Sequence, residues 1–509
     1  MSMLREYWKF ISNYIKDNKN YLLCFLGLLS LFIWFILPIK YLIHFTSDDS
    51  YFYLKTAWNF SKGLGSSFDG INLTNGYHPL LFLVLSLFYF LTNSIMNLNS
   101  ENLLRFTFFI TSIINLISIF FINKVFKELN FERPYLTSII FYLLAIPFTL
   151  LYLFGVEIQL MIMIYLALVF ITIYKKFNDS KLNFITGILL GLLFLVRIDL
   201  GLLLAIIFVL IRLNKYNQKQ ILFVVFPFFV IIISYLIINK IYFDTYSSIS
   251  SYYKFSLDIK NNLRFFPTPL SNPIDFSMLV IFLASGLVYL LYKINSKQIS
   301  NHLIKIFELS YIIAFLFLLI QYFLNRQGVR EWYYTFPIFI AFTLLTIVID
   351  RKKLHKLFLL PSIFVFVLYF TLFRMNYYNH DSAYEFSKKV QELVKENEII
   401  FQIDYSGLIS FFSERIIVNG DGLINSFNYY KTLKQGKLFD YLDYLKPQYF
   451  IFYSFQKDDE KAQYEFQSFH RYLFEFNRDR ILLKYPFIYG GIFRKKYGHF
   501  YLIKFKQNN

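Results

Sequence analysis

Apolar residues gather in long runs along most of the chain, and short polar segments separate these runs. The first run, Tyr21 to Ile39, follows a basic segment at residues 1–20 and has about 19 residues, enough to cross a hydrocarbon core ~30 Å thick. No cleavage site for a signal peptidase follows it, so we interpret it as a signal anchor. Further runs lie at 103–122, 135–154, 158–174, 184–196, 200–211, 220–239, 276–292, 304–324, 334–349 and 355–373. The pattern predicts an α-helical polytopic membrane protein with about eleven transmembrane helices.

Two apolar stretches depart from this pattern. The run His78 to Leu91 is too short for a full span, and we interpret it as a helix at the membrane interface. Residues 182–213 would make a single helix about 48 Å long, which is far longer than the hydrocarbon core is thick. Arg197 and Asp199 interrupt this stretch, and a charged group at the centre of a span costs about 2.5–3.5 kcal/mol. We therefore expect two short spans that meet at a turn lining a cavity.

Lysine and arginine are concentrated in alternate loops between the runs. The basic loops contain Lys124, Lys127 and Arg133; Lys175, Lys176 and Lys181; Arg212, Lys215 and Lys219; Lys293, Lys297 and Lys305; and Arg351, Lys352, Lys353 and Lys356. Short cytoplasmic loops are enriched in these residue types, so we predict that these loops and the N-terminus are cytoplasmic. An odd number of crossings then places the C-terminal part outside the cytoplasm, in a multi-pass protein of the cytoplasmic (inner) membrane.

The composition agrees with a membrane location and excludes other classes of protein. Apolar residues make up 57% of the chain and charged residues 17%, whereas soluble globular chains carry about 25% charged residues. The net charge of +18 would suggest nucleic acid in a soluble protein, but its distribution follows the membrane topology, and we expect no nucleic-acid partner. Cys24 is the only cysteine, so neither a disulfide framework nor a cysteine zinc site can form within the chain.

The periodicity changes in the last part of the chain. A helix is predicted at Ala383 to Glu396, buried strands at Glu398 to Ile403, Arg415 to Asn419 and Gln448 to Tyr453, and helical sequence around Tyr429 to Leu445. Alternating strands and helices indicate a small α/β domain. Gly491 to Lys506 is expected to form a β-hairpin with its turn at Tyr497-Gly498. The predicted organisation is a cytoplasmic segment 1–20, a transmembrane domain 21–373 with a first outer loop at 40–102, and an extracytoplasmic α/β domain 374–509.

Unusual polar residues collect in the segments predicted to lie outside the cytoplasm. Asp48 and Asp49 directly follow the first span. Two close carboxylates raise the pKa of each other and can act as a general base, bind a divalent cation, or do both. The alternative is that this pair only caps a solvated helix, which is the commoner role of such a pair taken alone.

Other candidates on this side each have a structural alternative. Glu157 can cap a helix, and Arg197 and Asp199 can form an ion pair that joins two half-spans. Lys254 and Arg330 lie beside aromatic residues and can bind phosphate or anchor the protein at the membrane interface. Tyr51, Trp332 and Tyr333 can stack on a sugar or serve as the same kind of anchor. What favours a functional site is that carboxylates, cations and aromatic rings all fall on one side of the membrane domain.

Several common motifs are missing from the sequence. It has no Walker loop, no dinucleotide-binding glycine fingerprint after a predicted strand, no His-Glu-x-x-His helix and no Gly-x-Ser-x-Gly elbow. ATP-driven transport and serine hydrolysis therefore have little support.

A set of short motifs resembles bacterial polytopic membrane glycosyltransferases of the GT-C superfamily, which use polyprenyl-phosphate sugars. The motifs are Ser47-Asp48-Asp49-Ser-Tyr51-Phe-Tyr53, Asn75-Gly76-Tyr77-His78-Pro79, Gly155-Val-Glu157, the stretch from Gly191 to Asp199, the loop Asn239 to Lys254, Trp332-Tyr333-Tyr334-x-x-Pro337, Asp404-x-x-Gly407 and Val418-Asn-Gly420-Asp421-Gly422. Family members show similar motifs in the same order, and the resemblance covers nearly the whole chain.

The resemblance implies an inverting transferase that moves a hexose or pentose from a polyprenyl-phosphate donor to an envelope lipid, glycan or protein. Asp48 matches the essential acidic residue of the family's first outer loop and would be the general base, with Asp49 beside it. Arg197, Lys254 and Arg330 would bind the donor phosphate. The implied substrate-binding residues are Tyr51, His78, Glu157, Asp199, Trp332 and Tyr333.

The resemblance leaves the metal requirement open. A divalent cation, Mg²⁺ or Mn²⁺, would be held by Asp48, Asp49 and Glu157, but only some relatives need one. Two other functions also stay open: a transporter or flippase for lipid-linked glycans, and an inactive protein of envelope assembly. A transporter would be expected to show internal repeats and ionisable residues near the bilayer midplane, neither of which the sequence indicates.

Overall fold

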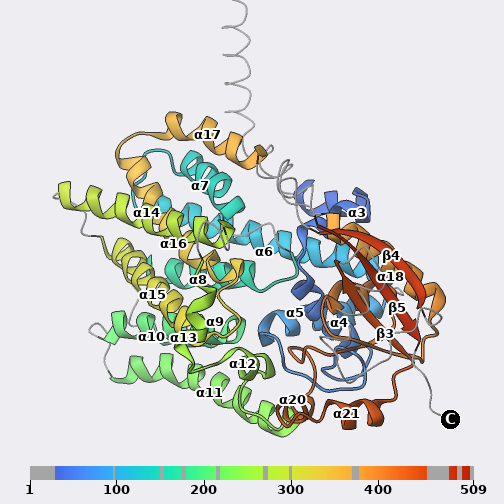
Figure 1. Cartoon of the computed structure of the whole chain (residues 1–509). Coiled ribbons are helices and arrows are strands. Elements are labelled where there is room, and N and C mark those ends of the chain that lie inside the picture. The colour runs from blue at the N-terminus through green and yellow to red at the C-terminus, as the bar shows by residue number, and fades with distance from the viewer. Residues whose placement is uncertain are drawn as a thin grey trace, which may run out of the picture.

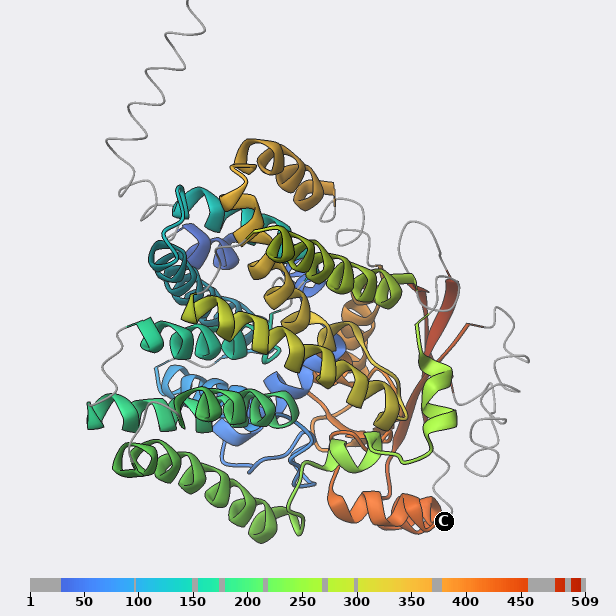
Figure 2. The same cartoon turned by 90° about the vertical axis from the view of Figure 1, so that its left-hand side faces the viewer.

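The protein consists of a helical membrane part and a C-terminal domain built on one β-sheet (Figure 1). The computed structural model describes residues 29–95, 98–148, 154–173, 179–213, 218–267, 273–296, 301–368, 378–455, 481–489 and 496–504. Most of the predicted first span lies outside these ranges. Two views at right angles place the sheet at one end of the stacked helices (Figures 1 and 2).

The membrane part contains helices at the positions of all the other predicted spans. In the described part of the chain, α6 (Ser100–Glu128), α11 (Gln218–Phe243), α14 (Pro273–Asn295) and α15 (His302–Leu324) are long and apolar enough to cross a membrane. The shorter helices are α5 (Pro79–Asn93), α7 (Pro134–Phe148), α8 (Ile158–Ile173), α9 (Ser180–Val196), α10 (Ile198–Leu213), α16 (Thr335–Arg351) and α17 (His355–Leu368). The chain is an integral membrane protein. The interfacial helix predicted at His78 to Leu91 corresponds to α5.

The break predicted within residues 182–213 is confirmed, and it determines where the Arg197 side chain begins. Arg197 lies between α9 and α10 and has an extended backbone with φ −155° and ψ 99°. Immediately after the break, α10 packs tightly on α9, since a side chain at Gly201 would collide with the carbonyl oxygen of Leu193. The two short helices therefore share one narrow turn rather than a single long axis.

The packing of α9 against α11 depends on Gly187. A Cβ atom at this position would collide with the backbone carbonyl oxygen of Val224 on α11. Because a backbone oxygen cannot rotate away, we expect Gly187→Ala to destabilise the protein by about 1–3 kcal/mol. Thermal unfolding in detergent measures this loss. Lys181→Ala, at an exposed position of the same helix, is the control, and an equal effect of both substitutions would contradict the close approach.

Two loops that were predicted to share the cytoplasmic side lie against each other. The buried carboxylate of Asp350 accepts hydrogen bonds from the backbone of Glu132 (3.1 Å) and contacts His355 Nε2 (3.1 Å). Arg351 donates to the carbonyl oxygen of Leu129 (2.8 Å). The junction of α6 with α7 is thus joined to the junction of α16 with α17, and the two junctions lie on the same side of the helical part.

The C-terminal domain has the predicted alternation of strands and helices. Its elements are α18 (Tyr378–Leu393), β1 (Ile399–Gln402), α19 (Ser406–Ser413), β2 (Ile416–Asn419), α20 (Phe427–Lys434), α21 (Leu438–Leu445), β3 (Tyr449–Ser454), β4 (Ile481–Tyr489) and β5 (Lys496–Lys504). The strand order is β2-β1-β3-β5-β4, in which β1 pairs parallel with β2 and β3, and β5 pairs antiparallel with β3 and β4. Phe401, Val418, Phe450 and Tyr501 belong to a buried core beside this sheet.

The hairpin predicted within Gly491 to Lys506, with its turn at Tyr497-Gly498, is wrong, because Lys496–Lys504 is the single strand β5 and its antiparallel partner is β4, earlier in the chain. Tyr497 and Gly498 lie inside β5, where Gly498 pairs with Phe487 of β4. A side chain at Gly498 would collide with the carbonyl oxygen of Ser454 on β3. The glycine is therefore explained by a close approach between strands, which is the other common role of glycine in a sheet.

Candidate functional site

One pocket gathers residues from five segments that were predicted to lie outside the cytoplasm. Its lining consists of Ser47, Asp49, Phe52, Tyr53, Gly76, Tyr77, His78, Val156, Glu157, Arg197, Ser250, Lys254, Trp332 and Tyr333. The space measures about 650 Å³ up to its open mouth. The pocket lies where the membrane helices meet the first outer loop, and it brings together residues nearly 290 positions apart.

Helix α4 (Asp48–Ser61) forms one wall of the pocket, and its two faces have different partners. Ser47 starts the helix with a capping box, in which it exchanges hydrogen bonds with Ser50. Asp49, Phe52 and Tyr53, spaced at i, i+3 and i+4, line the pocket. The residues at 48, 51, 55 and 58 form the other face and turn toward the C-terminal domain. The two adjacent aspartates are thereby directed to different places.

Asp48 does not line the pocket. Its carboxylate accepts hydrogen bonds from the backbone amides of Leu408 (2.8 Å) and Gly407 (3.2 Å) at the start of α19. Burial raises the pKa of the Asp48 carboxyl to about 8, although these two amides favour its charged form. Because both of its oxygens accept hydrogen bonds, Asp48 has the geometry of a helix cap. A neighbouring carboxylate is better placed to act as the base that was predicted at Asp48.

Asp49 is that neighbour. It lines the pocket, and among the described residues no hydrogen bond or ion pair engages its carboxylate. Burial raises the pKa of Asp49 above its ordinary value, and the charge of Glu157 adds to this rise, while the positive charges of Lys254 and Arg330 oppose it. A carboxylate with a raised pKa and a free edge is suited to accept a proton from a bound molecule.

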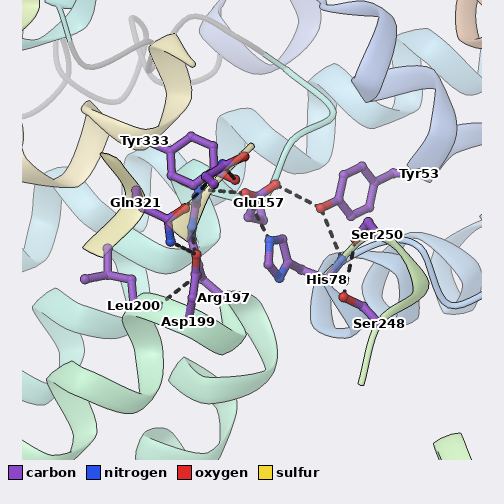
Figure 3. Close-up of polar contacts among 11 residues, drawn as sticks. Tyr53, His78, Glu157, Arg197, Asp199, Leu200, Ser248, Ser250, Gln321 and Tyr333 are labelled. Carbon is purple, nitrogen blue, oxygen red and sulfur yellow. Dashed lines mark hydrogen bonds and ion pairs between the residues drawn. The ribbon is translucent and has the colours of Figure 1, made fainter. Parts of the chain in front are cut away.

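Glu157 and Arg197 form a buried network at the base of the pocket (Figure 3). Arg197 pairs with Glu157 (3.1 Å) and with Asp199 (3.2 Å), and its guanidinium lies over the ring of Tyr333 at 4.7 Å. Glu157 also accepts a hydrogen bond from Tyr53 (3.0 Å). The charge of Arg197 is therefore already balanced by two carboxylates. These buried ion pairs account for Arg197 without the predicted role in phosphate binding.

Lys254 is differently placed. It ends α12 (Ile249–Lys254), lines the pocket, and has no ion-pair partner within the described ranges. The chain after Lys254 pairs with the chain after α15 through two backbone hydrogen bonds. The backbone amide of Arg326 donates to the Lys254 carbonyl (2.9 Å), and that of Ser256 donates to the Leu324 carbonyl (2.8 Å). This short ladder links the two cationic loops, one of which carries Arg330. Arg330 itself is exposed and outside the pocket lining, near enough for its charge to act on Asp49.

The motif Asn75-Gly76-Tyr77-His78-Pro79 holds α12 in place. Asn75 donates to Asn239 (3.0 Å) on α11 and to the Ser247 carbonyl (3.1 Å), and it accepts from the backbone of Ile249 (2.9 Å). One buried amide therefore ties the first outer loop to the segment that ends at Lys254. The sequence singled out this motif, but nothing in its pattern indicated this structural task.

The remaining predicted substrate residues divide into two groups. His78, Glu157, Trp332 and Tyr333 line the pocket. Burial lowers the pKa of His78, so its contact with Glu157 at 3.9 Å joins a neutral imidazole to a carboxylate.

Tyr51 and Asp199 do not line the pocket. Tyr51 is fully buried, shares a hydrogen bond with Thr46 (2.8 Å), and contacts the rings of Phe411 and Phe412. Asp199 lies behind the pocket between Arg197 and Gln321, whose amide donates to it (3.3 Å).

Several residues at the site were not among the candidates named from the sequence, and three of them are polar groups in or beside the pocket. Tyr53 and Ser250 line the pocket, and Gln321 supports Asp199 from α15. Tyr53 was recognisable, since it stands four positions after Asp49 and thus on the same helix face. Gln321 and Ser250 gave no signal, because single polar residues at the end of an apolar run or in a serine-rich loop are ordinary there.

The proposed metal ligands do not converge. Asp49 and Glu157 share the pocket, but Asp48 is turned to α19. Within the described part of the chain, no three His, Cys, Asp or Glu side chains are arranged to hold a metal ion. The three carboxylates named from the sequence therefore do not face one common point in this structure.

No protein-family model matches this chain, and no curated protein matches its sequence. Its fold does match solved structures. The crystal structure of ArnT from Cupriavidus metallidurans bound to undecaprenyl phosphate aligns with a TM-score of 0.56 and 9% sequence identity, over 95% of this chain and 98% of that chain. The chain shares the fold of ArnT. The apo-state structure of the same ArnT aligns over 96% and 98% of the two chains, with 9% identity and a TM-score of 0.41.

The likeness to ArnT extends over the membrane helices and the C-terminal domain together, since it covers nearly all of both chains. The expected architecture, a helical membrane part with a small C-terminal α/β domain, is thereby confirmed as the fold of ArnT. At 9% identity, the ArnT likeness concerns the fold, and the chemistry has to be argued from this chain's own residues.

Proposed function

We propose that the chain is a membrane glycosyltransferase that moves a sugar from a polyprenyl-phosphate carrier to an envelope acceptor outside the cytoplasm. One observation carries the proposal: Asp49 and Lys254 line the same pocket, and neither has an ion-pair partner among the described residues. A glycosyl transfer needs a base for the acceptor hydroxyl and a cation for the leaving phosphate, and this unpaired acid and cation can supply them. The ArnT crystal structure contains undecaprenyl phosphate, which supports a carrier of this class.

The reaction assigns each group one task. The oxygen of an acceptor hydroxyl attacks the anomeric carbon from the face opposite the phosphate, and Asp49 takes the hydroxyl proton. The bond from the anomeric carbon to the phosphate oxygen breaks, and its electron pair leaves with the polyprenyl phosphate. The configuration at that carbon is inverted. Asp49 then releases its proton to water, so that the products are the glycosylated acceptor and the free carrier phosphate.

Lys254 stabilises the charge that grows on the leaving phosphate. Burial by itself would lower the pKa of Lys254, but the groups around it, including Tyr333 and Asp49, keep that pKa above its ordinary value, and the side chain stays charged. A fixed cation in a site that excludes water is worth more than in solvent. Arg330, at the mouth, attracts the phosphate from the membrane surface, and His78 and Trp332 contact the sugar.

The proposed topology is the one that the basic loops predict. The lysine-rich loops and the N-terminus lie in the cytoplasm, and the pocket and the C-terminal domain lie on the opposite side of the inner membrane. The acceptor is a lipid, glycan or protein of the envelope.

The test of the function is transfer by the purified protein. Labelled polyprenyl-phosphate sugars are supplied with extracted envelope lipid and glycan, with and without chelator, and both the labelled product and the released polyprenyl phosphate are measured. Appearance of both in equal amounts supports the proposal. Movement of lipid-linked sugar between the leaflets of liposomes, with no transfer from any donor, would instead establish a transporter.

Lys254→Gln is expected to weaken binding of polyprenyl phosphate about 10-fold or more, because a hydrogen bond to a charged group contributes about 1.5–3 kcal/mol. Calorimetric titration of the detergent-solubilised protein measures the affinity. Lys260→Gln, at an exposed position a few residues later, is the matched control and is expected to bind like the wild type. Equal affinities of the wild type and Lys254→Gln would remove Lys254 from the phosphate site.

A further inference from the structure

Helix α19 of the C-terminal domain begins without a cap of its own. Its first residue follows Tyr405, which has a left-handed backbone with φ 58° and no capping side chain. The first amides of a helix need acceptors from elsewhere. Here the acceptor is the Asp48 carboxylate, which receives the amides of Gly407 and Leu408 from a helix more than 350 positions earlier in the chain.

The same face of α4 also serves the other end of α19. Lys55 is 6% exposed and donates to the carbonyl oxygen of Ser410 (3.2 Å), one of the last four carbonyls of that helix. Asp48 and Lys55 are two helical turns apart, which is nearly the length of α19. Asp48 and Lys55 therefore satisfy backbone groups of α19 at its N-terminal end and toward its C-terminal end.

Packing between the two polar contacts leaves no space for sliding. The ring centroid of Phe411 lies 5.4 Å from that of Tyr51 and 5.9 Å from that of Trp58. A Cβ atom at Gly407 would collide with the backbone carbonyl oxygen of Asp48. The two helices thus touch at backbone distance beside the residue that precedes Asp49.

We propose that α19 positions the carboxylate of Asp49, and that Asp48 and Lys55 are the residues through which it acts. This inference rests on the proposed role of Asp49 as the base. The capping box of Ser47 and Ser50 already starts α4, so α19 is not required to form that helix. What α19 adds is a fixed position and rotation of α4, which decide whether Asp49 points into the pocket. The C-terminal domain thereby acts on the reaction without touching the substrate.

Two substitutions at one position separate positioning from catalysis. Asp48→Ala removes both acceptor oxygens and is expected to lower kcat about 10-fold or more, with KM for the donor unchanged, because small displacements of a reacting group are costly. Asp48→Asn keeps one acceptor oxygen for the Leu408 amide and is expected to stay within about 3-fold of the wild-type kcat. A catalytic base at position 48 would instead make the asparagine variant as inactive as the alanine variant, and that result would overturn the inference.

Lys55→Met provides a second measurement at the far end of α19, and Lys55→Arg provides its conservative rescue. Lys55→Met is expected to reproduce the loss of kcat at constant KM and to shift the acid limb of the pH profile, because Asp49 gains access to water. Asp443→Ala, on the exposed face of α21 in the same domain, is the control. A folded Lys55→Met with wild-type kcat and pH profile would overturn the inference. Failure of the proposed function is a separate result, because the wild type itself would then transfer no sugar, and failure of the role of Asp49 would appear as full activity of Asp49→Asn.

Discussion

Asp49→Asn is expected to lower kcat for sugar transfer by about 10²–10⁴-fold and to leave the affinity for polyprenyl phosphate near the wild-type value. Asparagine has nearly the same shape but cannot accept the hydroxyl proton. In the proposed reaction the phosphate group is held by Lys254, which the substitution leaves in place, so we expect binding to survive. Initial rates with a saturating donor give kcat, and a separate titration gives the affinity.

The pH profile provides an independent check on Asp49. Since burial raises the pKa of Asp49, and the base acts in its ionised form, the rate should rise with pH along a limb centred above the ordinary aspartate value of 3.8. Asp49→Glu is expected to recover part of the rate and to move this limb. If Asp49→Asn transfers sugar at the wild-type rate, or if the acid limb is unchanged in Asp49→Glu, another group is the base.

Arg197→Gln is expected to destabilise the protein by about 3–5 kcal/mol, because it leaves Glu157 and Asp199 beside each other without their shared cation. Arg197 is 2% exposed and Glu157 is 5% exposed, so water does not replace the lost partner. Thermal unfolding in detergent and the yield of monodisperse protein measure the effect.

A surface ion pair provides the comparison for Arg197. Lys240 pairs with Asp244 (2.8 Å), but both side chains are largely exposed, and Lys240→Gln is expected to unfold like the wild type. The opposite pattern for Arg197→Gln, normal unfolding with a loss of polyprenyl-phosphate affinity, would show that Arg197 binds phosphate, as the sequence suggested.

Much of the fold could be predicted because a bilayer imposes simple rules. Apolar runs of sufficient length and basic loops at alternate positions were enough to place the helices α6 to α11 and α14 to α17. The charged pair Arg197 and Asp199 also revealed the break between α9 and α10, since one long helix could not bury both. The β-hairpin was harder: Gly498 permits either a turn or a close contact between strands, and only the position of Ser454 on β3 decides between them.

The residues of the site could be predicted better than their tasks. The outer segments were correctly grouped, and most of the named side chains line one pocket. Which of Asp48 and Asp49 faces that pocket depends on where α19 packs against α4, and α19 comes far later in the chain. Likewise, the sequence did not reveal which groups already engage Arg197, so Arg197 was interpreted as a phosphate ligand. Its partners are Glu157 on the preceding span and Tyr333 beyond α15, and both are distant from it in sequence.

The long separation between Asp48 and Gly407, which is 359 positions, also bears on when the protein becomes competent during its synthesis. A ribosome that has completed α15 has already produced Asp49, Glu157, Arg197 and Lys254, but α19, the helix that Asp48 caps, has yet to be made. The pocket wall therefore acquires its final support only when the C-terminal domain has emerged and folded. A chain interrupted in the last fifth of its length would carry the chemical groups of the pocket without the part that aligns them.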